Sequence, residues 1–121
     1  MEVRDRYRDI LLENIDYDVL IQNPQIDQEQ LNEIVEILVD TVCTSRKTIR
    51  IASDDFPAEV VRSRFLKLTG SHIQYVLACM RENTTRIRNI KKYLLAALYN
   101  ASVTMGSYYS ALVQHDLAEG G

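Results

Sequence analysis

Cationic side chains gather in one stretch late in the chain, TTRIRNIKKYLLAALYNA at residues 84–101. Guanidinium and ammonium groups bind carboxylates and phosphates, while leucine and tyrosine add apolar contact area. The stretch therefore predicts a surface that docks a protein partner or, alternatively, a weak site for single-stranded DNA on which an exposed Tyr99 stacks a base. The residues assigned to this surface are Arg86, Arg88, Lys91, Lys92, Leu95 and Tyr99.

The charge distribution leaves a third interpretation open. Residues 1–45 contain 11 acidic and 3 basic side chains, whereas residues 46–92 contain 4 acidic and 11 basic ones, although the whole chain carries only −3. An acidic first part can neutralise the basic segment within the same molecule, with Glu33, Glu36 and Asp40 as candidates, or the two parts can serve separate partners. The pI of about 5.3 is lower than that of a dedicated nucleic-acid-binding protein.

Residues suited to catalysis are few and scattered. His72 and His115 have no serine, cysteine or second histidine at a spacing typical of a catalytic site, and Cys43 and Cys79 lack metal-binding spacing. Four dispersed glycines form no phosphate-binding loop. We therefore expect no enzyme, no cofactor, no metal and no small-molecule substrate.

Hydrophobic periodicity predicts an all-α fold, a compact bundle of five or six helices in a single domain over residues 1–121. Alternation at Thr48–Ile51 allows one short β-hairpin near residues 48–56, with its turn at residues 53–55, and we expect a frayed tail at residues 118–121. The helices are expected over residues 3–22 as one or two segments, 28–44 behind an Asp27 cap, 58–68, 69–83, 84–101, and about 105–117.

The helix expected over residues 84–101 has two faces. One face, from Ile87 through Leu94 to Ala101, is aliphatic and predicts burial. The other face runs from Arg88 through Leu95 to Tyr99, and we expect it to be exposed. The helix therefore has the form of a core element with one side free for binding.

The residues from Phe56 to Ala101, FPAEVVRSRFLKLTGSHIQYVLACMRENTTRIRNIKKYLLAALYNA, are followed by YYSALVQHDL. Together they resemble the C-terminal domain of the replication initiator A proteins carried by plasmids and integrative elements of low-GC Gram-positive bacteria. The resemblance covers about Tyr7 to Leu117. YLLAALYNA is also similar to a helical motif of DnaD-type primosome proteins, with Tyr93 at its first position and Ala97 and Ala101 at the next two.

This resemblance implies a DnaD-like fold and a domain that forms the C-terminal part of a longer initiator. It further implies docking to host replication proteins, a helicase loader or primase, at the replication origin. The chain has no apolar run of about 20 residues, so we expect no membrane contact and a cytoplasmic location.

Overall fold

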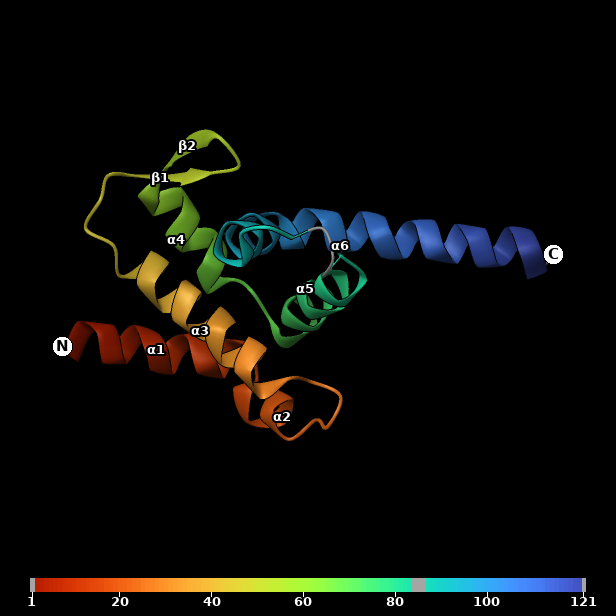
Figure 1. Cartoon of the computed structure of the whole chain (residues 1–121), viewed down its shortest axis with the longest axis horizontal. Helices are drawn as coiled ribbons and strands as arrows, with labels where there is room; N and C mark the ends of the chain where they lie inside the picture. Colours follow the sequence, from red (N-terminus) through yellow and green to blue (C-terminus); the bar gives the residue numbers. More distant parts are fainter. Residues whose placement is uncertain (1, 84–86, 121) are drawn as a thin grey trace.

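The computed structural model describes residues 2–83 and 87–120, with side chains through residue 105. In these residues the chain forms six helices and one antiparallel hairpin (Figure 1). The all-α fold with a short hairpin is therefore confirmed. The elements are α1 (Glu2–Asn14), α2 (Tyr17–Ile21), α3 (Gln28–Val42), β1 (Thr48–Ile51), β2 (Asp54–Pro57), α4 (Ala58–Leu66), α5 (Gly70–Asn83) and α6 (Ile90–Gly120).

Helix α3 is the centre of the core and packs against α1, α4 and α6. It begins where the sequence predicts, because the Asp27 carboxylate accepts hydrogen bonds from the backbone N–H groups of Glu29 and Gln30. Each fully buried aliphatic side chain contributes about 1.5–3 kcal/mol of transfer free energy. The buried residues of α3 are Leu31, Ile34, Val35, Ile37, Leu38, Val39 and Val42.

The connection between α1 and α2 brings distant parts of the chain into contact. Asp16 reverses the chain in the left-handed region, at φ 54° and ψ 50°. Helix α5 begins beside it at Gly70, where a Cβ atom would lie 2.8 Å from the backbone oxygen of Ile15. A residue without a side chain is therefore required at the start of α5.

The hairpin turn differs from its predicted position. The turn consists of Ala52 and Ser53, both with positive φ (52° and 75°), while Asp54 and Asp55 belong to β2. Positive φ at both central residues is the geometry of a two-residue type I′ turn, for which asparagine and glycine are the usual residues. The sequence signal misplaced the turn because neither Ala52 nor Ser53 is a typical residue for it.

Helix α6 is one continuous helix of 31 residues, where the sequence predicted two. The predicted break at residues 102–104 is wrong, because α6 runs through them, and the Thr104 hydroxyl donates a hydrogen bond of 3.0 Å to the Asn100 carbonyl one turn earlier. The helix includes residues 118–120, the region expected to fray. Its second half extends beyond the other elements (Figure 1).

Across the described part of the chain, no helix combines the length and the apolar character that crossing a membrane requires.

Candidate functional site

The predicted helix from residue 84 begins later than expected, at Ile90, so Lys91 and Lys92 lie in the first turn of α6 and Arg88 lies just before it. Arg88, Lys91 and Lys92 are exposed, and Leu95 is half-buried. Arg86 falls outside the described residues. The helix begins behind Asn89, whose side-chain oxygen accepts a hydrogen bond of 3.0 Å from the Lys92 backbone N–H. This cap fixes where the two lysines leave the helix.

Two adjacent hollows extend along β1 beside these cations. The first, about 380 Å³, is lined on the β1 side by Arg46, Ile49 and Arg50 and on the α6 side by Lys91 and Leu95. Its third side is formed by α3 and the residues after it, with Ile37, Asp40, Thr41 and Thr44.

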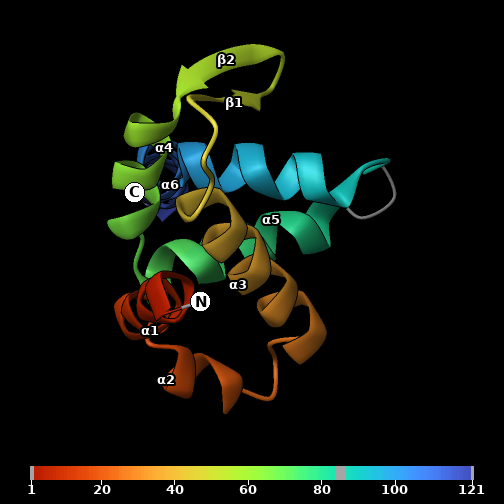
Figure 2. The ribbon, with the colours of Figure 1, turned by 90° about the vertical axis from the view of Figure 1, so that its left-hand side faces the viewer.

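The second hollow, about 230 Å³, continues to the hairpin turn and is lined by Arg50, Ile51, Lys92 and Leu95, among others. Figure 2 shows β1 beside the first turns of α6. Arg50 of β1 and Leu95 of α6 line both hollows, which together form one surface depression. We call it the basic groove, defined by Arg46, Arg50, Lys91, Lys92 and Leu95.

Most of the charge in the basic groove is uncompensated. Arg50 pairs across the hairpin with Asp55 at 3.3 Å, and both side chains are exposed. Among residues 2–83 and 87–105, no carboxylate lies within 4 Å of a basic nitrogen of Arg46, Lys91 or Lys92. The groove is therefore a concave surface with a net positive charge and an apolar floor.

The acidic face of α3 has different partners from those the sequence named. The Arg8 guanidinium lies 2.6 Å from the Glu36 carboxylate, and Arg4 lies 2.6 Å from Asp40 and 3.5 Å from Glu36. The hydrogen bond from Arg8 lowers the pKa of Glu36. Asp40 also lines the groove, but its carboxylate is engaged by Arg4.

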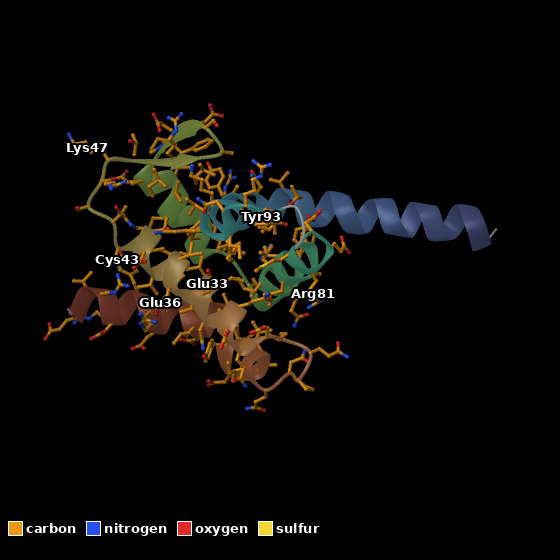
Figure 3. The ribbon with its side chains drawn as sticks, viewed as in Figure 1. Glu33, Glu36, Cys43, Lys47, Arg81 and Tyr93 are labelled. Atoms are coloured by element: carbon orange, nitrogen blue, oxygen red, sulfur yellow. The ribbon has the colours of Figure 1, made fainter. Side chains whose placement is uncertain are left out.

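Figure 3 shows Glu36 on α3 beside α1, while Lys47 extends away from the body before β1. Glu33 is exposed and forms no ion pair within the described residues. Glu36 and Asp40 of α3 thus pair with Arg4 and Arg8 of α1, and in the part of the chain that the structure describes neither forms an ion pair with a cation of the basic groove.

Tyr99 is buried, and its predicted exposure is wrong. Only 6% of the residue is accessible. Its ring lies 4.8 Å from the ring of Phe56, centroid to centroid, and 4.1 Å below the Arg64 guanidinium. Helical spacing placed Tyr99 on the same face as Arg88, but β2 and α4 cover that face further along the helix. Tyr99 therefore belongs to the packing between α6 and the hairpin.

Tyr93, the motif residue, is half-buried and packs against the core rather than facing the groove. Burial raises the pKa of its phenol, and the Cys79 thiol beside it adds to the shift. The hydroxyl is therefore neutral at physiological pH. Tyr93 acts here as a packing residue between α5 and α6 (Figure 3).

The first turn of α6 carries two positive charges, although the N-terminus of a helix is unfavourable for cations. The exposed N–H groups at a helix N-terminus amount to about half a positive charge, which destabilises nearby cations. Lys91 and Lys92 occupy this turn, whereas α3 and α4 carry acidic residues in theirs. The positive end of α6 therefore reinforces the positive potential of the basic groove.

Sequence reasoning missed Arg46 and Arg50. Both precede the lysines by more than 40 residues and meet them only because β1 lies against α6. The available signal was the excess of basic residues from residue 46 onward. That excess indicated the sign of the charge but not which residues would share a surface.

The scattered histidine and cysteine side chains have ordinary structural surroundings. His72 Nδ1 lies 3.0 Å from both the backbone nitrogen and the hydroxyl of Thr69, so it helps to cap α5. Cys43 and Cys79 are free and half-buried. In the described residues, no three histidine, cysteine or acidic side chains are grouped to hold a metal ion.

The fold and the groove define an all-α domain with a small β-hairpin and a positively charged surface beside it. The chain belongs to the family described as a family of unknown function, DUF6017, whose model matches residues 1–120. No curated protein and no solved structure matches the chain. The family description assigns no function, so a function for this chain has to be inferred from the groove and its charges.

Proposed function

We propose that this domain is a non-catalytic docking module whose basic groove binds an acidic surface of a replication protein. The proposed partner is a primase or helicase loader of the host, recruited in the cytoplasm to the replication origin of a plasmid or mobile element. The replication context comes from the resemblance of residues 56–101 to initiator C-terminal domains. The docking role comes from the groove.

The observation that carries the proposal is the combination of uncompensated cations with an apolar floor. Arg46, Lys91 and Lys92 have no carboxylate partner within the described residues, and Leu95 and Ile49 lie half-buried between them. Protein interfaces combine a desolvated apolar centre with a polar rim that steers the partner by charge. The groove has both features on a small scale.

Single-stranded DNA is the alternative ligand, and the burial of Tyr99 argues against it. Proteins that bind single strands combine a basic track with exposed aromatic rings on which bases stack. Tyr99 was the ring assigned to that task, and it is covered by Phe56 and Arg64. The basic groove keeps the charges that a phosphate backbone needs but has no aromatic platform among its lining residues.

A purely structural role for the basic segment has less support. It requires the acidic residues of the first helices to neutralise Arg88, Lys91 and Lys92. Two of those acids, Glu36 and Asp40, are instead bound to α1 by Arg8 and Arg4. The cations at the start of α6 are therefore available to a second molecule.

The proposal is tested by calorimetric titration of the domain with purified primase and helicase loader from a low-GC Gram-positive bacterium. Binding to one of them is expected. The double variant Arg46→Glu/Lys91→Glu should weaken it about tenfold or more, since each reversed charge near a partner carboxylate changes binding by roughly 1 kcal/mol.

The matched control is Arg81→Glu, which reverses an exposed arginine on α5, away from the groove (Figure 3). It should bind like the unchanged domain. Absence of binding to both proteins, or equal loss in the control and the groove variant, contradicts the proposal. Titration with a single-stranded oligonucleotide across a salt series tests DNA binding. If the groove binds the phosphate backbone, the logarithm of the binding constant should fall with the logarithm of the salt concentration, with a slope of about −0.7 per contacted phosphate.

A further inference from the structure

The hairpin has one strand edge that remains free for pairing. β1 and β2 pair Thr48 with Pro57, Ile49 with Phe56, and Arg50 with Asp55. The Ala58 N–H donates a hydrogen bond of 2.9 Å to the Lys47 carbonyl, which fixes the alternation of bonded and non-bonded pairs along the hairpin. The N–H and C=O groups of Thr48 and Arg50 consequently point away from β2.

These outward groups of β1 have no hydrogen-bond partner in the described part of the chain. The opposite edge of the hairpin differs, because β2 carries Pro57 at a non-bonded position, where the missing N–H would have pointed outward. Proline is a common device for preventing strand addition at an exposed edge. Asp55 keeps the other outward N–H of β2, whereas β1 keeps both of its own, so the β1 edge is the better suited to accept a further strand.

The free edge opens into the basic groove. Both hollows are lined by residues of β1 and of α6, the first one also by residues of α3, and neither is lined by a residue of β2. Along β1, the side chains of Ile49 and Ile51 face the core while Thr48 and Arg50 are exposed. A strand placed beside β1 would thus have one face toward Leu95 and Ile49 and the other beside Arg50 and Arg46.

We propose that the basic groove binds an extended acidic segment of the partner protein, which pairs with the β1 edge as a third strand of the hairpin. The inference rests on the proposed docking role of the groove and specifies the form of the ligand. Backbone hydrogen bonds to Thr48 and Arg50 supply affinity, and alternate side chains supply selectivity. Carboxylates beside Arg46, Arg50, Lys91 and Lys92 select an acidic sequence.

A helical ligand would use the groove differently. It would satisfy its own backbone groups and leave those of Thr48 and Arg50 to water, so only side chains would contribute. An extended segment satisfies both sets of groups at once. The unblocked edge of β1 beside the partly blocked edge of β2 is the feature that favours the extended form.

The test uses a synthetic peptide of alternating glutamate and valine as the probe, titrated into the intact domain. Two further peptides carry N-methyl groups on all valines or on all glutamates. In an added strand the N–H groups of alternate residues face β1, so one methylated peptide should bind about tenfold or more weakly and the other should bind like the parent. Equal affinity of all three peptides overturns strand addition.

A protein-side variant gives an independent readout. Thr48→Pro removes an outward N–H at the first position of β1, where proline is tolerated, and should weaken peptide binding. Thr48→Val keeps the N–H and is the matched control, with binding unchanged. If Thr48→Pro fails to fold, hydrogen exchange of the Thr48 and Arg50 amides in the unchanged domain tests strand addition instead. Bound peptide should slow the exchange at both positions, and unchanged exchange would overturn the inference.

The outcomes separate this inference from the proposed function. If primase or helicase loader binds and loses affinity with Arg46→Glu/Lys91→Glu, while the peptide gives no protection of Thr48 and Arg50, the groove docks a partner in another form and strand addition is wrong. If neither protein binds but the peptide shows the N-methyl difference and the amide protection, strand addition stands and the choice of replication partner is wrong.

Discussion

The guanidinium of Arg64 lies 4.1 Å from the centroid of the Tyr99 ring and donates a hydrogen bond of 3.1 Å to the Tyr99 carbonyl. Phe56 of β2 packs on the same ring. One tyrosine thus joins α4, α6 and the hairpin. Because β2 pairs with β1, this contact also ties the strand that lines the basic groove to α6.

This relationship predicts a measurable coupling. A double-mutant cycle with Arg64→Met and Tyr99→Leu, followed by chemical unfolding, should give a coupling energy of about 0.5–2 kcal/mol, since the cation lies over a buried ring. Tyr99→Leu alone should destabilise the fold by more than 1 kcal/mol because it removes the contact with Phe56. Additive effects of the two substitutions would show that the stacked geometry contributes nothing.

A second prediction concerns the close approach at Gly70. Alanine normally stabilises a helix relative to glycine by about 1 kcal/mol. At this position its Cβ would lie 2.8 Å from the backbone oxygen of Ile15, which cannot move as a side chain can. Gly70→Ala should therefore lower the free energy of unfolding by about 1–2 kcal/mol. The control is the exposed neighbour Ser71, where Ser71→Ala should change the free energy of unfolding by less than about 0.5 kcal/mol.

The strained turn of the hairpin provides a third prediction. Ala52 and Ser53 both adopt positive φ, which disfavours residues with a Cβ atom. The double substitution Ala52→Asn/Ser53→Gly supplies the residues that this turn prefers and should raise the free energy of unfolding by about 1 kcal/mol. Thermal and chemical unfolding of the variant and the unchanged domain measure this difference in the free energy of unfolding. A loss of stability would mean that the turn does not have the type I′ geometry described.

A fourth prediction follows from the ion pair between Arg8 and Glu36. The pKa of Glu36 is lowered below its ordinary value of 4.5 by the hydrogen bond from Arg8. The folded chain then holds fewer protons at this site than the unfolded chain, so its contribution is complete above pH 4.5 and is lost as pH falls through the lowered pKa.

Half of the Glu36 side chain is exposed, so solvent screening limits this contribution to about 0.2–1 kcal/mol. Glu36→Gln should reduce the free energy of unfolding by that amount at pH 7 and flatten its decline toward pH 3. Unfolding curves at a series of pH values measure both effects. An identical pH dependence in the two proteins would rule out the pair as a source of acid sensitivity.

The sequence was sufficient for features that depend on local pattern. The buried stripe of α3 follows from helical spacing, and Asp27 caps that helix as its position predicts. The hairpin was visible in the alternation at Thr48–Ile51. Each of these signals lies within a few residues, where periodicity and capping chemistry operate.

Features that depend on neighbours were not predictable from one sequence. Helical spacing gives the angle of Tyr99 around α6 but not which element covers it, and the covering residues, Phe56 and Arg64, lie 35 or more positions earlier. The same limit hid the pairing of Arg4 with Asp40 and the meeting of Arg46 with Lys91. Charge totals revealed an imbalance between segments, whereas tertiary packing decided which charges remained free.

The most direct test of the central claim compares stability and binding in Lys91→Glu/Lys92→Glu. If these lysines serve binding rather than folding, acidic residues in the first turn of α6 should leave the free energy of unfolding unchanged or raise it by up to about 1 kcal/mol, while affinity for the primase or helicase loader falls about tenfold or more. Unchanged affinity in a stably folded variant would contradict the claim that the basic groove is the docking site.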